Sequence, residues 1–111
     1  MGKSKRTKAC EIPPEIKKIV EKRDSINGQC CCIFCGSPNA KGEAHVIGRA
    51  QAGLGVEKNL VSVCRECHRM MDNTTFRPLY IEKAKEYLKS IYPDWKEEEL
   101  IYNKWKGLKY D

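Results

Sequence analysis

Four cysteines with metal-ligand spacing are the residues best suited to chemistry in this chain. Two Cys-x-x-Cys pairs, Cys32/Cys35 and Cys64/Cys67, are separated by 28 residues. Each pair can grip one metal ion from a tight turn, and four thiolates form a usual tetrahedral site for structural zinc. The pattern predicts a bound Zn²⁺, with Cys31 as an alternative ligand on spacing. The same thiolates also suit an iron–sulfur or rubredoxin-like centre.

Two histidines and an aspartate fall inside or beside the same frame. His45 lies between the cysteine pairs, His68 directly follows the last cysteine, and Asp72 comes four residues later. Residues four apart share one face of a helix, so His68 and Asp72 can together bind a divalent cation. A neutral histidine such as His45, placed near that cation, can take a proton from water and deliver hydroxide to phosphorus.

Each of these polar residues has a plainer explanation when it is considered alone. His45 can be a packed strand histidine, and Asp72 can be a solvated carboxylate at a helix end. Arg49 can be a surface cation, and Asn59 can bond only to the backbone of a turn. Their joint position within one short frame is what favours a functional site.

Local patterns predict the elements that must position these residues. Apolar side chains at Ile16, Ile19 and Val20 have the spacing of one helical face, and Asn27-Gly28 marks a turn. Gly36, just after the first cysteine pair, permits a positive φ. We expect, in chain order, a helix over 13–24, a turn over 25–28, strands over 43–48 and 59–63, and a helix over 66–73.

A C-terminal helix is expected over about 78–92. Its apolar stripe suits core packing, Pro93 ends it, and Asp94 can cap a short turn over 95–99. The tail over 100–111, which carries Trp105 and Tyr110, is expected to lie along the body as an extended arm. The members of the stripe are Leu79, Ile81, Ala84, Tyr87, Leu88 and Ile91.

Together these elements predict the α+β class. Two strands followed by a helix, with zinc joining the 32–35 turn to the helix start, make a small treble-clef-like core. Helices at the N- and C-terminal sides flank this zinc-stapled core. We expect a basic flexible arm over 1–12 and a single domain over 13–111, whose core spans 24–75.

Composition favours one small domain with a polyanionic partner. Only 41% of the 111 residues are hydrophobic and 8% are aromatic, so the core is modest and benefits from a metal staple. Lys and Arg total 21 against 15 Asp and Glu, a formal charge of +6. A basic surplus of this kind suits nucleic acid.

The cysteines also bear on the compartment. Seven cysteines are an odd number, their spacing is metal-like, and the charged start is followed by no apolar run. We therefore expect a reducing, cytoplasmic location, with no membrane span and no disulfide framework.

Residues 24–72 resemble the HNH endonuclease family, with its ββα-metal fold, and in particular the zinc-knuckle type of phage and bacterial proteins. The resemblance covers nearly half the chain. Each motif alone is weak, whereas their order and spacing are specific. The matching stretches are Arg23-Asp24, Cys32-Ile33-Phe34-Cys35-Gly36, Ala44-His45-Val46-Ile47-Gly48-Arg49, Asn59-Leu60-Val61 and Cys64-Arg65-Glu66-Cys67-His68.

The resemblance implies a role for each matching residue. His45 matches the general base, and Asn59 matches the asparagine that fixes the hairpin and helps orient that histidine. His68 matches a metal-binding histidine, and Asp72 sits where a second helix ligand is often found. Arg49 sits where a basic residue often approaches the phosphate backbone, and the four cysteines match the structural zinc ligands. The implied activity is DNA hydrolysis with Mg²⁺, Mn²⁺ or Ni²⁺, leaving 5′-phosphate products.

One position departs from the family pattern. Many members place a His or Asp immediately before the base, whereas this chain has Ala44, which cannot bind a metal. Glu43 is adjacent to Ala44, but successive side chains of a regular strand point to opposite faces, so we expect Glu43 to point away from the metal site. The alternative function is therefore a catalytically weak or inactive zinc-stapled module that binds nucleic acid. In either case we expect a monomer or weak dimer that binds DNA, alone or within a larger phage or bacterial complex.

Overall fold

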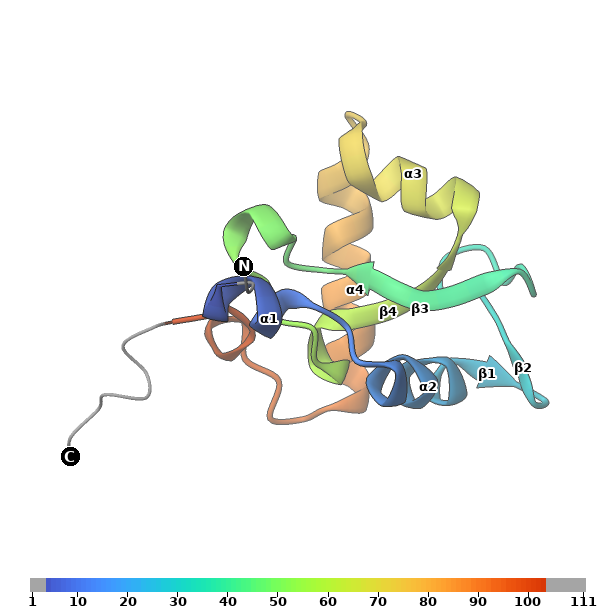
Figure 1. Ribbon diagram of the computed structural model, residues 1–111. Helices are drawn as coiled ribbons and strands as arrows, with labels where there is room; N and C mark the ends of the chain where they lie inside the picture. Colours follow the sequence, from blue (N-terminus) through green and yellow to red (C-terminus); the bar gives the residue numbers. More distant parts are fainter. Residues whose placement is uncertain (1–3, 104–111) are drawn as a thin grey trace.

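A two-stranded antiparallel sheet is at the centre of the computed structural model, which describes residues 4–103 apart from the side chain of residue 73 (Figure 1). Its strands are β3 (Ala40–His45) and β4 (Leu60–Cys64). A second, smaller hairpin pairs β1 (Ser25–Ile26) with β2 (Gln29–Cys30). The helices are α1 (Lys5–Cys10), α2 (Pro14–Arg23), α3 (Arg65–Asn73) and α4 (Arg77–Ile91), and the 3-10 turns are η1 (Arg49–Gln51), η2 (Glu57–Asn59) and η3 (Glu97–Leu100).

Several sequence predictions are confirmed in this order of elements. The helices α2 and α3 agree with their expected spans to within one residue. Asn27 and Gly28 both have positive φ, 53° and 81°, as a tight hairpin turn between β1 and β2 requires. Gly36 has a φ of 79°, and a Cβ there would meet nothing within 4 Å, so conformation rather than space favours glycine.

The first central strand differs from its prediction. It was expected over 43–48, but β3 begins at Ala40 and ends at His45. Its pairing with β4 runs from Ala40 opposite Cys64 to His45 opposite Leu60, with an irregularity between Lys41 and Ala44. Three steps on β3 face two on β4, which is a bulge of one residue. After His45, the N–H of Val46 still donates to the carbonyl of Asn59, but the N–H of Ile47 donates to the side chain of Asn59 instead of to a strand backbone, so the regular ladder ends there.

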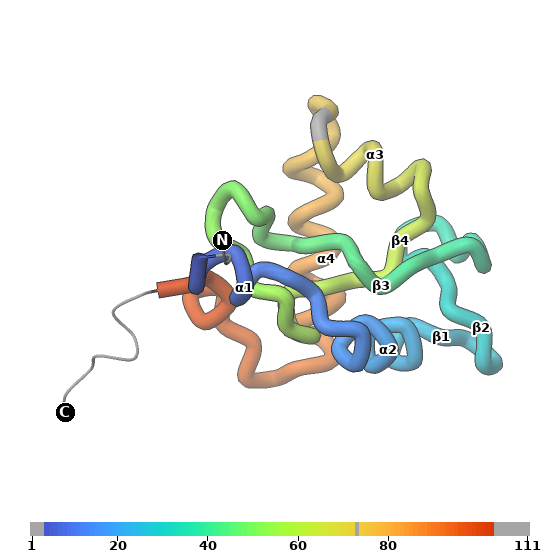
Figure 2. Tube along the Cα trace, viewed as in Figure 1, coloured from blue at the N-terminus to red at the C-terminus, as the bar shows by residue number. Residues whose placement is uncertain are grey.

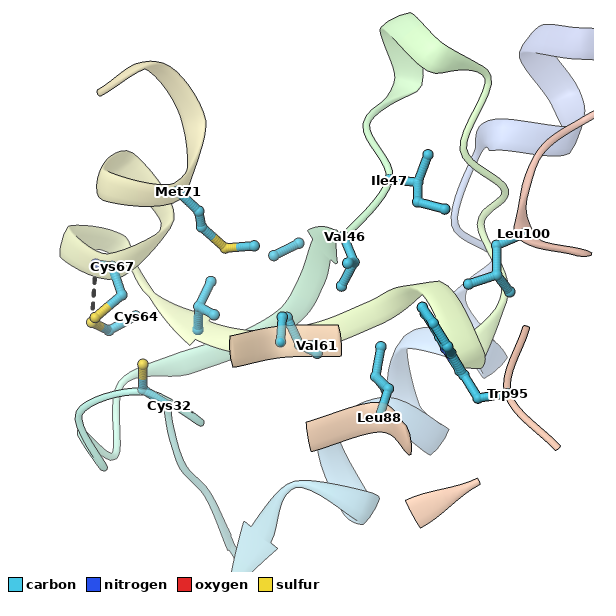
Figure 3. Packing of buried hydrophobic residues seen from close by; sticks show 13 residues of the cluster. Cys32, Val46, Ile47, Val61, Cys64, Cys67, Met71, Leu88, Trp95 and Leu100 are labelled. Atoms are coloured by element: carbon cyan, nitrogen blue, oxygen red, sulfur yellow. Dashed lines mark hydrogen bonds between the residues drawn. The ribbon is translucent and has the colours of Figure 1, made fainter. Parts of the chain in front are cut away.

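Helices cover the sheet and complete the hydrophobic core. Val46 and Val61 belong to the same buried cluster as Ala84 and Leu88, which lie four residues apart on one face of α4. Figure 3 shows Val46, Val61 and Leu88 in this cluster. Met71 of α3 joins the same cluster. The apolar stripe on α4 is thus a core face, except that its first member, Leu79, is 54% exposed. Within residues 4–103, no helix combines the length and apolar composition that crossing a membrane requires.

The N-terminal segment differs from the flexible arm that the sequence predicts. Residues 5–10 form α1, whose N-cap Ser4 accepts a hydrogen bond from the backbone of Thr7. Cys10 is only 3% exposed, and the carbonyl of Ala9 accepts from the backbone N–H of Gly55. These long-range backbone contacts anchor the segment, and no apolar periodicity in the sequence signals them.

The last described residues, at the red end of the tube in Figure 2, pair with the 52–54 segment. Ile101 forms an isolated antiparallel bridge with Gly53, and the N–H of Tyr102 donates to the carbonyl of Ala52 over 2.8 Å. This agrees with an extended arm along the body. Trp105 and Tyr110, which the same prediction includes, lie outside the described residues. The expected turn over 95–99 forms later in the chain, as the 3-10 turn η3 over Glu97–Leu100. Its N-cap is Lys96 rather than the predicted Asp94, whose carboxylate accepts a hydrogen bond from Lys58 instead.

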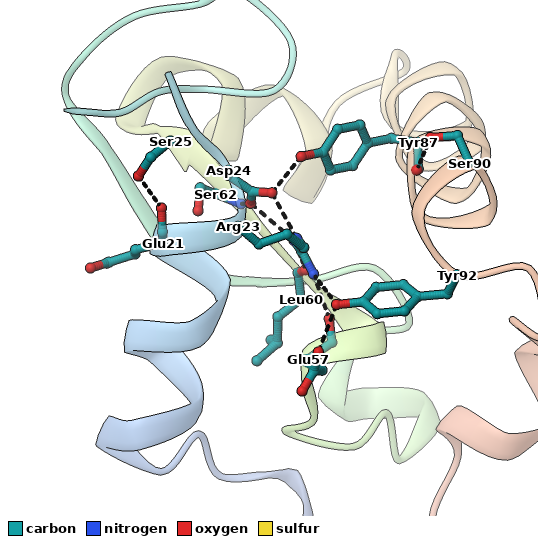
Figure 4. A network of polar contacts seen from close by, with 10 residues as sticks. All are labelled: Glu21, Arg23, Asp24, Ser25, Glu57, Leu60, Ser62, Tyr87, Ser90 and Tyr92. Carbon is teal, nitrogen blue, oxygen red and sulfur yellow. Dashed lines mark hydrogen bonds and ion pairs between the residues drawn. The ribbon is translucent and has the colours of Figure 1, made fainter. Parts of the chain in front are cut away.

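A buried ion pair ties α2 to the sheet and to α4 (Figure 4). Asp24 is 5% exposed and accepts two hydrogen bonds from Arg23, at 2.7 and 2.9 Å, as well as bonds from the Ser62 N–H and the Tyr87 hydroxyl. Arg23 also donates to the carbonyl of Leu60. Burial lowers the pKa of Arg23, but the hydrogen bonds that it donates to Asp24 and Tyr92 outweigh this effect and raise the pKa above its ordinary value, so the guanidinium stays charged.

Removing one member of this pair leaves the other charge buried without its partner. We expect Asp24→Ala to lower the free energy of unfolding by about 3–5 kcal/mol, measured by urea denaturation. The control is Asp94→Ala, which breaks the exposed pair between Asp94 and Lys58 and should leave stability nearly unchanged. Equal losses in the two variants would contradict the structural importance of the buried pair.

Candidate functional site

Four cysteines from three segments meet at one end of the core. Figure 3 shows Cys32, Cys64 and Cys67 there. Cys32 and Cys35 lie in the loop after β2, Cys64 ends β4, and Cys67 is in the first turn of α3. Their sulfur atoms all lie within 4.8 Å of one another, and those of Cys35 and Cys64 are 3.6 Å apart. Zinc–sulfur bonds of about 2.3 Å give tetrahedral edges of about 3.8 Å. The cluster can therefore hold a metal ion such as zinc.

Backbone contacts shape the loop that carries the first two thiols. The N–H of Gly36 donates to the carbonyl of Cys32 over 2.9 Å, and the N–H of Cys32 donates to the carbonyl of Ser37 over 2.8 Å. The N–H of Ile33 donates to the carbonyl of Ser62, which fastens the loop to β4. The loop is thus positioned by the sheet as well as by any bound ion.

The thiols of the cluster influence one another's ionisation. Burial raises the pKa of Cys67, and the neighbouring Cys64 and Cys32 raise it further. Burial also raises the pKa of Cys32, but backbone N–H donors outweigh that effect and lower it to about 7. Four thiolates this close repel one another, so a divalent cation favours the deprotonated set and its binding releases protons.

Cys31 is not part of this cluster. Its thiol donates to the carbonyl of Gln29 over 3.2 Å, and the group of potential metal ligands contains only the other four cysteines. The alternative in which Cys31 replaces a member of the first pair is therefore wrong for this conformation.

A separate cavity of about 1200 Å³ brings together the remaining predicted site residues except Asn59. His45 at the end of β3, Arg49 in η1, and His68 and Asp72 on α3 all contribute to its lining. The cavity lies between the segment after α1, the β3 strand, the 48–51 turn and the exposed face of α3. Residues chosen from the sequence for base, phosphate and metal roles thus share one cavity.

His45 is the half-buried member of this group. Its Nε2 lies 2.9 Å from the carbonyl oxygen of Cys10. Burial lowers the pKa of His45, and the positive charges of Arg49 and His68 lower it further, against the opposing effect of the Cys10 carbonyl. Its pKa thus lies below the ordinary value of 6.5, so the imidazole is neutral at pH 7 and able to accept a proton.

His68 and Asp72 offer two exposed ligand groups on one face of α3. Within residues 4–103, however, only the four-cysteine cluster gathers three or more potential ligands closely enough to hold an ion. A cation bound at His68 and Asp72 therefore needs further oxygen ligands, which water and a phosphate can supply.

The alanine before His45 does not face the cavity. Ala44 has no exposed surface and packs in the core, whereas Glu43 and His45 both line the cavity. Residues two apart on a strand share a face, which explains why Glu43 rather than Ala44 lies on the side of the base. Glu43 carries an ion pair with Lys17, with an Nζ–Oε2 distance of 3.1 Å.

Asn59 supports the loop beside the site and does not line the cavity. It is fully buried, its Oδ1 accepts from the N–H of Ile47 over 2.8 Å, and its Nδ2 donates to the carbonyls of Ile47 and Leu54. These bonds hold the 47–54 loop, which carries Arg49. A Cβ at Gly53 would lie 1.7 Å from the carbonyl oxygen of Ile47, so the loop closes only around glycine.

Glu43 and Arg77 are among the charged lining residues that the sequence does not predict as part of the site. The strand alternation relative to Ala44 predicts that Glu43 points away from the metal site. Its spacing of two from His45 predicts instead that it shares the strand face of His45, as the structure shows. Arg77 also lines the cavity, and its Nη1 donates to the carbonyl of Met71 at the end of α3 over 2.9 Å. No sequence pattern marked Arg77, because its position depends on how α4 turns back against α3.

Comparison with family models, curated proteins and solved structures finds no match to this chain. The resemblance to the HNH family thus rests on the motifs and their spacing.

The cluster geometry predicts one tightly held zinc per chain. We expect the purified protein to be colourless, and Cys67→Ser to lose the zinc and the cooperative thermal transition, because three segments lose their common ligand. Elemental analysis and circular dichroism measure the two effects. Cys31→Ser is the matched control and should retain both. Visible absorbance typical of iron, or full zinc retention by Cys67→Ser, would contradict the assignment.

Proposed function

We propose that this protein is a metal-dependent HNH-type endonuclease that hydrolyses DNA phosphodiester bonds. One observation carries the proposal: His45, Arg49, His68 and Asp72, selected from motif positions, line the same cavity. A chance arrangement of a strand histidine, a loop arginine and two helix ligands has no reason to converge there.

The proposed chemistry assigns one step to each group. His45 takes a proton from a water molecule, whose oxygen forms a bond to the phosphorus. The bond from phosphorus to the 3′ oxygen breaks, and that oxygen leaves with the electron pair and takes up a proton from solvent. The products are a 5′-phosphate and a 3′-hydroxyl. A divalent cation held by His68 and Asp72 would stabilise the negative charge that develops on the phosphate oxygens.

The arrangement of elements supports the same proposal. The order β3, β4, α3, with four cysteines joining a preceding loop to the helix start, fits a ββα-metal, treble-clef-like core. In this interpretation the cysteine-bound zinc is structural, because four thiolates leave no open position for substrate.

Charge supports DNA as the substrate. The chain carries a formal +6, and both Arg49 and Arg77 lie at the cavity. Arginines of this kind neutralise phosphates independently of base sequence. The half-buried His45 at the same cavity, whose pKa burial lowers, supports a hydrolytic site over a purely electrostatic binding surface.

The second candidate is a zinc-stapled DNA-binding module without catalytic activity. The observation that favours this candidate is that only two protein ligands, His68 and Asp72, are predicted for the catalytic divalent cation. Such a module binds DNA with a strong salt dependence and leaves it intact.

Plasmid nicking separates the two candidates. We expect the full chain to convert supercoiled plasmid to nicked circles with Mg²⁺, Mn²⁺ or Ni²⁺. His45→Ala should lower the rate about 10²–10⁴-fold, the usual contribution of a general base. The measurement is the initial rate of nicking, with DNA affinity followed separately by fluorescence anisotropy.

The control for this experiment is Lys96→Ala, which removes an exposed cation away from the cavity and should nick at the wild-type rate. DNA binding without nicking under all three ions would favour the inactive module. Equal rates for wild type and His45→Ala would mean that any cleavage observed does not use this base.

A further inference from the structure

The carbonyl of Cys10 constrains which nitrogen of His45 carries the proton. Nε2 of His45 lies 2.9 Å from that carbonyl oxygen, and a carbonyl oxygen only accepts hydrogen bonds. Nε2 must therefore be the protonated nitrogen in this contact. In the neutral imidazole, Nδ1 is then left with the free lone pair.

The segment that brings this carbonyl to the site is held at two further places. The guanidinium of Arg6 donates to the carbonyls of Arg49 and Ala50, each over 3.1 Å. The carbonyl of Ala9 accepts from the N–H of Gly55 over 3.0 Å. The segment is thus attached to the loop that carries Arg49 at residues 49 and 50, and to Gly55 just after that loop.

Gly55 allows the segment to approach this closely. A Cβ at position 55 would lie 1.8 Å from the carbonyl oxygen of Glu11 and 3.2 Å from that of Cys10. The obstacle is backbone, which cannot move aside as a flexible side chain would. Any side chain here must push the segment, and with it the Cys10 carbonyl, away from His45.

The same segment forms one wall of the cavity. Its residues Glu11 and Ile12 line the cavity together with His45. The segment therefore contributes to the burial of the imidazole as well as to its hydrogen bonding.

We propose that the N-terminal segment 4–12 is a positioning element of the site, in which the Cys10 carbonyl holds the Nε2–H of His45 and leaves Nδ1 as the proton-accepting nitrogen. The inference rests on the proposed function, because it names the atom to which the attacking water gives its proton. Cys10 acts through its backbone and touches no substrate, so it positions His45 without reacting itself.

Nuclear magnetic resonance tests the contact directly, because the chain has only two histidines. In uniformly ¹⁵N,¹³C-labelled full-length protein at pH 8, we expect a slowly exchanging Nε2–H signal from His45 with a scalar coupling to the Cys10 carbonyl carbon. The His68→Ala variant assigns the two imidazoles. A wild-type His45 that carries its proton on Nδ1 would overturn the inference.

Gly55→Ala tests the consequence. We expect it to lose the Nε2–H signal and to lower turnover about 10²-fold, as small misplacements of catalytic groups do, while KM for DNA changes little. Loss of the signal with wild-type turnover would overturn the positioning role.

A milder pair of variants covers the case in which Gly55→Ala does not fold. Arg6→Ala removes the anchor to Arg49 and Ala50, whereas Lys8→Ala removes the same charge from α1, where Lys8 is exposed. We expect faster Nε2–H exchange and lower turnover only for Arg6→Ala. Equal behaviour of the two variants would overturn the inference.

The two kinds of measurement separate two kinds of failure. Absence of cleavage by the wild type would overturn the proposed function whatever the spectra show. A His45 proton on Nδ1 would overturn the positioning inference even if the wild type cleaves DNA.

Discussion

The crowding of four thiols at one end of the sheet is the constraint on which the rest of the structure depends. Their sulfurs lie within 4.8 Å of one another and join the 32–35 loop, the end of β4 and the start of α3. A two-stranded sheet is marginal by itself, so a shared ligand and the Arg23–Asp24 pair beside β4 stabilise what hydrophobic burial alone does not. The cluster also fixes where α3 begins. His68, one residue beyond Cys67, therefore emerges at a set position relative to β3.

The candidate site follows from that anchoring. α3 supplies His68 and Asp72, β3 supplies His45, and the loop held by Asn59 supplies Arg49, so three elements with independent supports meet at one cavity. The N-terminal segment closes the remaining side and lowers the exposure of His45. Each polar group thus gains its proposed role from an element fixed by contacts elsewhere. Because these supports are separate, a small domain can hold the half-buried His45 beside the exposed His68 and Asp72.

Spacing along the chain predicts much of this structure, and contacts across it account for the differences. The cysteine pairs, the Asn27-Gly28 turn and the spans of α2 and α3 depend on local chemistry and are confirmed. The bounds of β3 were wrong because a bulge near Lys41 and the buried Asn59 side chain set them, and neither leaves a periodic signal. The anchoring of α1 depends on backbone groups such as the Gly55 N–H, which side-chain patterns do not reveal. Ala44 was expected to occupy the position of a missing metal ligand. It is instead buried in the core, and the cavity lies on the other face of the strand, with Glu43 and His45.

The position of a divalent cation tests the central claim most directly. Crystals of the full chain with Mn²⁺ and a short DNA duplex, measured at the manganese and zinc absorption edges, distinguish the two metals. We predict a zinc peak within the four-cysteine cluster and a manganese peak between His68 and Asp72, in the cavity that contains His45. Manganese bound to the DNA complex only outside that cavity would contradict the proposed catalytic site.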